Sequence, residues 1–203
     1  MNDREQWDSR FAPDGYVFGE APNAFLVEQS ARLTPGMRVL AVADGEGRNG
    51  VWMAERGCEV VSVDVSPRGR EKALALARRK GVTLDYQIAD LAEWDWPEAA
   101  FDAVVAIFIQ FADPVRRARI FAGMKRAVKP GGVVLIQGYR PEQIAYGTGG
   151  PKTVENLYDE ALLRTMFGDF AIEHLRIHDS EIVEGEGHRG MSALIDLVAR
   201  RPD

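Results

Sequence analysis

The residues best suited to chemistry lie where a short apolar run meets three glycines. Residues 39–42 are apolar, Gly45, Gly47 and Gly50 follow, and the pattern then becomes helical. Because glycine lacks a Cβ, such a loop can approach a ligand closely, and the free N–H groups of the following helix point at it. Asp64 ends the next apolar run, where its carboxylate can accept hydrogen bonds from ribose hydroxyls. Loop and carboxylate together indicate a nucleoside-containing ligand.

The spacing of the three glycines also fits a dinucleotide-binding loop, so a nicotinamide-dependent oxidoreductase is one alternative. Against it, Asp44 and Glu46 place two carboxylates in the loop, and these would repel a pyrophosphate. S-adenosylmethionine carries a sulfonium and an ammonium group and no phosphate, so the charge of the loop favours this cofactor. A protein that binds S-adenosylmethionine without catalysis is a second alternative.

The composition is that of a soluble globular chain. It has 203 residues, of which 46% are hydrophobic and 28% charged, and we expect a single domain over residues 1–203, with an N-terminal lid or helix segment over 1–34 and a core over 35–203. The single cysteine, Cys58, excludes a disulfide framework and a paired-cysteine zinc site, and we expect no metal. The polar amino end and the absence of a long apolar run predict a cytoplasmic protein without membrane contact.

The charge argues against a nucleic-acid partner. The net charge is −6, whereas phosphate binding needs clustered lysines and arginines on one face. We interpret the basic clusters as solvated helix faces; these are Arg68 with Arg70, residues 78–80, and Arg116 and Arg117 with Arg119. We expect a small-molecule substrate and a monomer or weak homodimer.

Strand-like and helix-like runs alternate as far as Gly138. The predicted strands span residues 37–43, 59–63, 83–88, 101–108 and 133–137, and the predicted helices 24–33, 48–56, 67–80 and 115–128. Ser66-Pro67 and Asp113-Pro114 supply N-cap and N1 residues, and residues 129–132 predict a turn. Such alternation predicts a parallel, doubly wound α/β sheet with helices on both faces. Beyond it we expect a helix over 154–167 and two antiparallel strands over 172–183 and 191–199.

With its glycine loop, the acids Asp64 and Asp90 after strands two and three, and a closing hairpin, the chain resembles the class I S-adenosylmethionine-dependent methyltransferases from about Thr34 to its end. The resemblance implies a Rossmann-like, doubly wound, seven-stranded sheet, mostly parallel with an antiparallel last strand, in the order 3-2-1-4-5-7-6. The amino segment, Trp7-Asp8-x-Arg10-Phe11 and then Pro22-Asn23-x-Phe25-Leu26, is similar to small bacterial methyltransferases grouped with tellurite-resistance and thiopurine-methylating enzymes. In that group the amino segment lies over the bound cofactor.

The resemblance also implies roles for individual residues. Asp64 matches the ribose-binding acid, and Asp90 with Leu91 matches the pair that binds adenine. Ala41 and Ala43 depart from the usual acid and glycine of the first motif, so the role of the missing carboxylate passes to Asp44 or Glu46. The predicted cofactor-binding residues are Tyr16, Phe18, Ala43, Asp44, Gly45, Gly47, Asn49, Asp64, Val65, Asp90, Leu91, Ile107 and Phe108. Of the amino-terminal aromatics, we expect Trp7 and Phe25 in the core and Tyr16 and Phe18 in a lid.

The candidate catalytic residues come from two loops that we expect on the same edge of the sheet as the cofactor loop. His188 and Arg189 lie in the last turn, and Arg140 and Tyr146 follow the fifth strand. These side chains suit an anionic or soft acceptor, which needs no general base if it is already ionised. The Asn- or Asp-Pro-Pro-aromatic pattern of enzymes that methylate nucleobases is missing at residues 106–109. We therefore expect methyl transfer to a small molecule.

Overall fold

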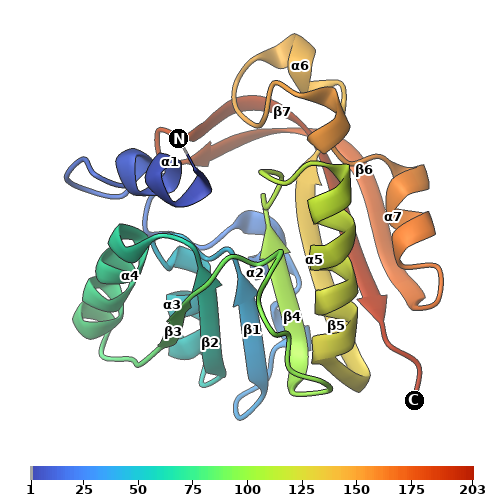
Figure 1. The fold of residues 1–203 in the computed structure, drawn as a ribbon, viewed down its shortest axis with the longest axis horizontal. Coiled ribbons are helices and arrows are strands. Elements are labelled where there is room, and N and C mark those ends of the chain that lie inside the picture. Colours follow the sequence, from blue (N-terminus) through green and yellow to red (C-terminus); the bar gives the residue numbers. More distant parts are fainter. Residues whose placement is uncertain (1) are drawn as a thin grey trace.

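A seven-stranded sheet forms the centre of the molecule. The computed structural model describes residues 2–203, and its strand order is β3-β2-β1-β4-β5-β7-β6 (Figure 1). The strands are β1 (Arg38–Val42), β2 (Glu59–Asp64), β3 (Asp85–Ile88), β4 (Phe101–Ile107), β5 (Val128–Tyr139), β6 (Ala171–Glu184) and β7 (His188–Arg200). The first five strands are parallel, and β7 is antiparallel to both β5 and β6. The predicted fold class and strand order are confirmed.

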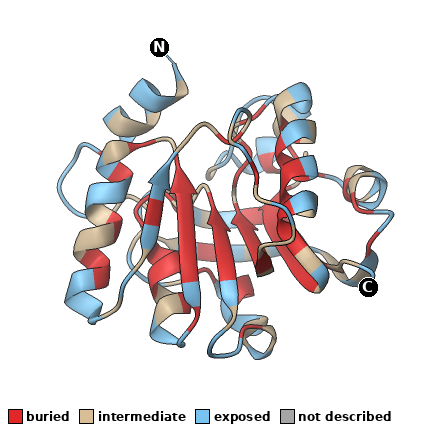
Figure 2. Ribbon diagram, turned by 60° about the horizontal axis from the view of Figure 1, so that its bottom comes forward, coloured by how far each residue is buried: buried red, intermediate tan, exposed pale blue. Residues whose placement is uncertain are grey.

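Helices cover both faces of the sheet. α5 (Pro114–Ala127) and α7 (Glu160–Met166) pack on one face, and α2 (Ala24–Glu28) and α3 (Arg48–Glu55) pack on the other. Each face of the sheet forms its own hydrophobic core with the helices that cover it. Consecutive strand residues belong alternately to one core and the other, because successive side chains of a strand point to opposite faces. The inner strands β1, β2 and β4 are accordingly almost entirely buried (Figure 2), whereas the edge strands β3 and β6 are mostly not. The remaining helices are α1 (Asp3–Arg10), η1 (Ser30–Arg32), α4 (Pro67–Lys80), α6 (Gln143–Tyr146) and η2 (Val154–Asn156).

The predicted helix starts at Pro67 and Pro114 are confirmed. Ser66 caps α4 by accepting from the N–H of Gly69, and Asp113 caps α5 by accepting from the N–H of Arg116. In both helices proline occupies the first turn, where the missing N–H has no intrahelical partner to lose. These caps place the N-termini of α4 and α5 at the carboxyl ends of the parallel strands, the edge at which ligands bind in doubly wound sheets.

Three predicted elements are wrong. The helix expected over 154–167 breaks into η2 and α7, because the chain between them runs extended, the N–H of Tyr158 donates to the carbonyl of Tyr139, and Asp159 caps a new helix. Residues 129–132 form no separate turn but lie within β5, where the register against β4 shifts between Phe101 and Ala103. This irregularity accommodates the extra residues on one strand. The helix expected over 24–33 is likewise divided, into α2 and η1.

The amino segment lies across the carboxyl ends of the strands (Figure 1). Its helix α1, which the sequence did not predict, begins with a capping box between Asn2 and Glu5. Asp8 of α1 accepts from the Ser66 hydroxyl and the N–H of Arg68, and so ties this helix to the start of α4. α1 is therefore held over the site by the same helix start that follows Asp64.

Candidate functional site

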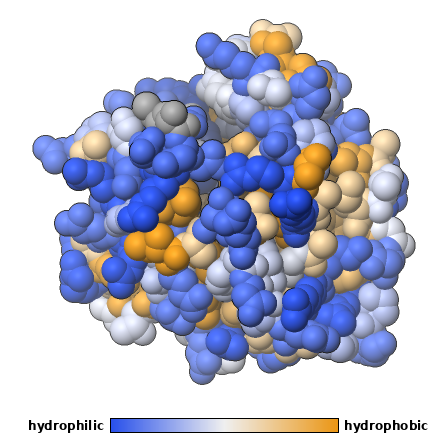
Figure 3. All heavy atoms as spheres, viewed as in Figure 1, coloured by the Kyte–Doolittle hydropathy of each residue, from blue (hydrophilic) through white to orange (hydrophobic). Residues whose placement is uncertain are grey.

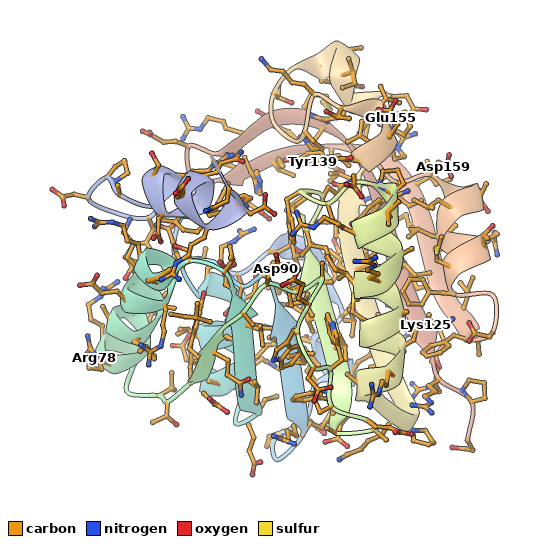
Figure 4. The ribbon with its side chains drawn as sticks, viewed as in Figure 1. Arg78, Asp90, Lys125, Tyr139, Glu155 and Asp159 are labelled. Carbon is orange, nitrogen blue, oxygen red and sulfur yellow. The ribbon has the colours of Figure 1, made fainter. Side chains whose placement is uncertain are left out.

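A cavity of about 310 Å³ lies between α1 and the carboxyl ends of the parallel strands. Its lining comes from α1, the loop after β1, the ends of β2, β4 and β5, the loop after β3, and the β6–β7 turn. Asp90 and Tyr139, which line it from the β3 and β5 sides, lie at this edge (Figure 4), and the face around it is mostly hydrophilic (Figure 3). The elements that line the cavity lie far apart in the sequence, and the strand order brings them together.

Most of the predicted cofactor-binding residues line this cavity. They are Phe18, Ala43, Asp44, Gly45, Asn49, Asp64, Val65, Asp90, Leu91, Ile107 and Phe108. Tyr16 and Gly47 do not line it. The Tyr16 hydroxyl instead donates to the carbonyl of Lys72 in α4, 3.0 Å away. A Cβ on Gly47, which has φ +85°, would lie 2.5 Å from the Cβ of Ala73, so this glycine allows the loop to pack against α4.

Asp64 joins the glycine loop to β2. Its Oδ2 accepts from the N–H of Gly45 at 2.9 Å, and its Oδ1 accepts from the N–H of Ser66 at 2.9 Å. Burial raises the pKa of Asp64 to about 6, against the lowering effect of these backbone hydrogen bonds. Each carboxylate oxygen still has a free lone pair, because a carboxylate has about four acceptor sites. The group can therefore hold the loop and accept from two ribose hydroxyls at once.

Asp44 turns its carboxylate into the protein. Its Oδ2 accepts from the Ser62 hydroxyl at 2.7 Å, and its Oδ1 accepts from the N–H of Gly50 at 3.1 Å. A Cβ on Gly50 would lie 2.3 Å from Asp44 Oδ2, so the third glycine of the motif makes room for this carboxylate. Burial raises the pKa of Asp44 to about 7. Because a carboxylate occupies the first turn of α3, that helix end is poorly suited to a pyrophosphate.

Glu46 binds the amino segment and does not line the cavity. Its side chain is buried and accepts from the N–H groups of Val17 and Phe18 at 2.8 and 3.4 Å. Lys72 of α4 pairs with its other oxygen at 2.9 Å. Of the two acids expected to replace the missing carboxylate, only Asp44 lines the cavity.

Asp90 is linked to α1 through an arginine that the sequence did not reveal. Arg116 donates to both oxygens of Asp90 at 3.1 Å and to Asp3 of α1 at 2.6 Å. Leu91 is buried beside it. The interpretation of Arg116 and Arg117 as part of a solvated face is wrong, because Arg117 is also buried and donates to the carbonyl of Glu155. Charge clustering on a helix does not show which members meet a carboxylate from another element.

At the other end of the cavity, His188 lies among aromatic rings. Its ring centroid is 4.4 Å from that of Phe18 and 4.5 Å from that of Phe108. Nδ1 faces Glu184 at 3.9 Å, too far for a hydrogen bond, and Glu184 forms a buried ion pair with Arg48 at 2.6 Å. Burial lowers the pKa of His188 despite the opposing effect of Glu184, which leaves the imidazole neutral near pH 7.

The other three candidate catalytic residues do not line the cavity. Arg140 and Tyr146 both bind Asp179 on β6, the tyrosine hydroxyl at 3.0 Å, and Arg189 is exposed. Their loops were correctly expected near this edge, but their side chains turn to β6 or to solvent.

Residues of the lining that the sequence analysis did not single out as site residues include Asp3, Gln6, Trp7, Arg10, Phe11, Arg48, Gln110, Phe111, Arg116, Tyr139 and Asn156. The expected core position is right for Phe25 and wrong for Trp7, which is partly exposed in the lining.

The chain is similar to known methyltransferases. A family model described as a methyltransferase domain matches residues 39–132. An uncharacterized methyltransferase of Synechocystis is 33% identical over 129 residues, which are 62% of this chain and 58% of that protein. The chain covers 41% of the similar uncharacterized mycobacterial proteins, so it spans less than two thirds of these curated relatives.

Two solved structures share the fold at low sequence identity. N-methyltransferase NodS from Bradyrhizobium japonicum, in complex with S-adenosyl-L-homocysteine, has a TM-score of 0.75 and 15% identity, with all of both chains covered. TehB from Haemophilus influenzae has a TM-score of 0.73 and 16% identity over 98% of this chain and 66% of that one. The match of a methyltransferase-domain model to residues 39–132 and the strand order both support the expected likeness to the class I S-adenosylmethionine-dependent methyltransferases.

Two further observations concern residues 2–203 only. No helix in this range is long and apolar enough to cross a membrane. No three His, Cys, Asp or Glu side chains of these residues are grouped so that they could hold a metal ion.

Proposed function

We propose that this chain transfers a methyl group from S-adenosylmethionine to a small-molecule acceptor. One observation carries the proposal: Asp64 and Asp90, at the ends of neighbouring strands, line one cavity with the glycine loop after β1. Carboxylates in these two places suit the ribose and the adenine of one nucleoside. The bound cofactor would supply a methyl group on a positively charged sulfur.

The opposite end of the cavity suits the acceptor. Ile107 and Phe108 at the end of β4 wall the cavity there, and His188 faces it. The Nδ1 atom of His188 is enclosed on the Glu184 side, so Nε2 is the ring nitrogen available to an acceptor. A neutral imidazole in this place can take a proton from an acceptor that must lose one. An ionised thiol or another soft anion would need only positioning. The likeness to tellurite-resistance and thiopurine-methylating enzymes remains part of this proposal.

Calorimetric titration with S-adenosylmethionine, S-adenosylhomocysteine and NAD tests the proposal. We expect the two adenosyl ligands to bind and NAD not to bind. Asp64→Ala should weaken S-adenosylmethionine by about 1.5–3 kcal/mol, since a charge-assisted hydrogen bond is lost. Asp64→Asn, which keeps one carbonyl acceptor, should have a smaller effect.

Asp85→Ala is the matched control, because Asp85 is an exposed acid on β3 outside the cavity lining. Thermal unfolding of each variant separates a loss of binding from a loss of structure, since Asp64 also holds Gly45. Binding of NAD alone would overturn the proposed function. Binding of S-adenosylmethionine without turnover of thiols, amines or small carboxylates would favour a non-catalytic binding protein.

A further inference from the structure

Arg10 is placed in the cavity without a carboxylate partner. It is the last residue of α1, and its guanidinium carbon lies 5.3 Å from the ring centroid of Trp7 and 5.0 Å from that of Phe18. Both rings and Arg10 itself line the cavity. Burial lowers the pKa of Arg10, yet a guanidinium stays protonated at any physiological pH. Aromatic rings hold this cation in position but leave its N–H donors unused.

The other arginines of the lining differ from Arg10. Arg48 pairs with Glu184 at 2.6 Å, and Arg116 pairs with Asp3 and Asp90. Among residues 2–203, Arg10 is thus the arginine of the cavity that forms no salt bridge. Arg10 is an exposed residue at the mouth of the cavity, so its N–H donors are free to bind an anion that enters.

Tyr139 lines the same cavity, and its hydroxyl is a second donor without a partner in the described part of the chain. It is buried and has no hydrogen-bond partner among residues 2–203, although buried hydroxyls normally have one. Phe108 stacks on the tyrosine ring with a centroid distance of 4.6 Å and fixes its orientation. Burial raises the pKa of Tyr139 well above its usual value, so the hydroxyl keeps its proton. Arg10 lies over the ring of Phe18, and the centroid of His188 is 4.4 Å from that of Phe18 and 5.8 Å from that of Tyr139. A continuous row of rings in the cavity lining therefore joins Arg10 to Tyr139.

We propose that Arg10 and the Tyr139 hydroxyl form an anion subsite, and that the methyl acceptor carries a carboxylate or a similar anionic group that binds there. This inference rests on the proposed function. The methionine part of the cofactor also carries a carboxylate, so the anion bound at this subsite could belong either to the acceptor or to the cofactor. We favour the acceptor because Tyr139 ends β5, which is separated by β4 from the strand that carries the glycine loop. Arg10 comes from the end of α1 and lines the same cavity.

The test is a titration of the full chain loaded with S-adenosylhomocysteine. Acetate and benzoate are each compared with their neutral amides. We expect at least one carboxylate to bind about tenfold more tightly than its amide, and Arg10→Gln to remove this preference. Tyr139→Phe should weaken the carboxylate severalfold, and its folding should be unaffected because the hydroxyl has no partner to lose. Arg4→Gln is the matched control, since Arg4 is an exposed arginine of the same helix outside the lining.

The affinity of S-adenosylhomocysteine itself separates the two sources of the anion. We expect Arg10→Gln to leave this affinity within about twofold. If the variant instead weakens S-adenosylhomocysteine about tenfold but leaves 5′-methylthioadenosine unchanged, Arg10 binds the cofactor carboxylate and the inference is overturned. It is also overturned if neither carboxylate is preferred over its amide. Failure of the wild-type chain to bind S-adenosylhomocysteine would refute the proposed function instead.

Discussion

The two ends of the cavity present different ionisable groups. The end at β1, β2 and β3 presents Asp44, Asp64 and Asp90, and the end at β4, β5 and β7 presents Arg10 and His188. The acids receive hydrogen bonds from the backbone of their own or the neighbouring loop, whereas the cation and the imidazole are held by aromatic rings. The first end therefore suits a cationic nucleoside and the second an anionic acceptor. Substitutions at each end test how far binding and stability there depend on the charged groups.

The largest effect should come from the buried ion pair at the acceptor end. Arg48 and Glu184 expose only 8% and 9% of their side chains. Arg48→Met should lower the free energy of unfolding by about 3–5 kcal/mol, because it leaves Glu184 as an uncompensated buried charge. Urea denaturation measures the change.

Arg79→Met is the control for this prediction. Arg79 pairs with Glu20 at 2.7 Å, but both side chains are about half exposed, at 49% and 46%. Its loss should change the free energy of unfolding by less than about 1 kcal/mol. Equal effects of the two substitutions would mean that the Arg48–Glu184 pair is hydrated, and the acceptor end would then be wetter than the geometry indicates.

A smaller effect is expected from His188→Gln, which tests whether the acceptor must lose a proton. With an amine or hydroxyl acceptor, kcat/KM should fall by about 100-fold, or about 2.7 kcal/mol, because the base is lost. With a thiol assayed above its own pKa, the fall should be much smaller. Initial rates with S-adenosylmethionine over pH 6–9 measure both.

His174→Gln is the matched control for His188. His174 is also a partly enclosed histidine whose Nε2 has no hydrogen-bond partner, but it lies on β6 beside Phe25, outside the cavity lining. Its substitution should leave the rates unchanged. An equal loss in both variants would show that His188 acts through the packing of the sheet and not as a base.

The two ends also differ in how far the sequence predicts them. Asp64 ends a short apolar run and Asp90 follows a strand-like segment. In a parallel sheet the carboxyl ends of such strands meet at one edge, so local patterns suffice to bring the two acids together. Arg10 and Tyr139 line one cavity although they lie more than a hundred positions apart in the chain, and no local pattern predicts this. The pattern of apolar residues predicts on which face of its strand or helix a residue lies. It does not predict which side chain from a distant segment that residue will contact.

The errors in the predicted fold have the same cause. Hydrophobic periodicity continues through residues 154–167, yet the helix is interrupted because Tyr158 is buried and hydrogen-bonds to the end of β5. The charge pattern predicts Arg116 as part of a solvated helix face, since nothing near it in the sequence shows that Asp3 and Asp90 converge on it. Elements with strong local signals, such as the capped starts of α4 and α5, were predicted correctly.

The smallest effect concerns the pH dependence of the acidic end. Burial raises the pKa of Asp44 to about 7 in the folded chain, far above that of an exposed aspartate in the unfolded chain. The folded state therefore binds more protons between these two values, and the contribution of Asp44 to stability falls as pH rises from about 4 to about 7. Asp44→Asn removes this contribution while keeping an acceptor for the N–H of Gly50, so its unfolding free energy should decline less with rising pH.

The comparison of wild type with Asp44→Asn isolates this group from others that titrate nearby. The pKa of Asp64 is raised to about 6, so the unfolding free energy also declines with rising pH because of this group. The lowered pKa of His188 instead makes the unfolding free energy rise with pH. Both contributions are the same in wild type and variant. We expect the difference in unfolding free energy to grow by about 2 kcal/mol in favour of the variant between pH 5 and pH 8, measured by urea denaturation. Substitution of the exposed Asp14 by Asn should give no such slope. Parallel curves for wild type and Asp44→Asn would mean that this carboxylate is already ionised at pH 5, and that the hydrogen bonds from Ser62 and Gly50 compensate fully for its burial.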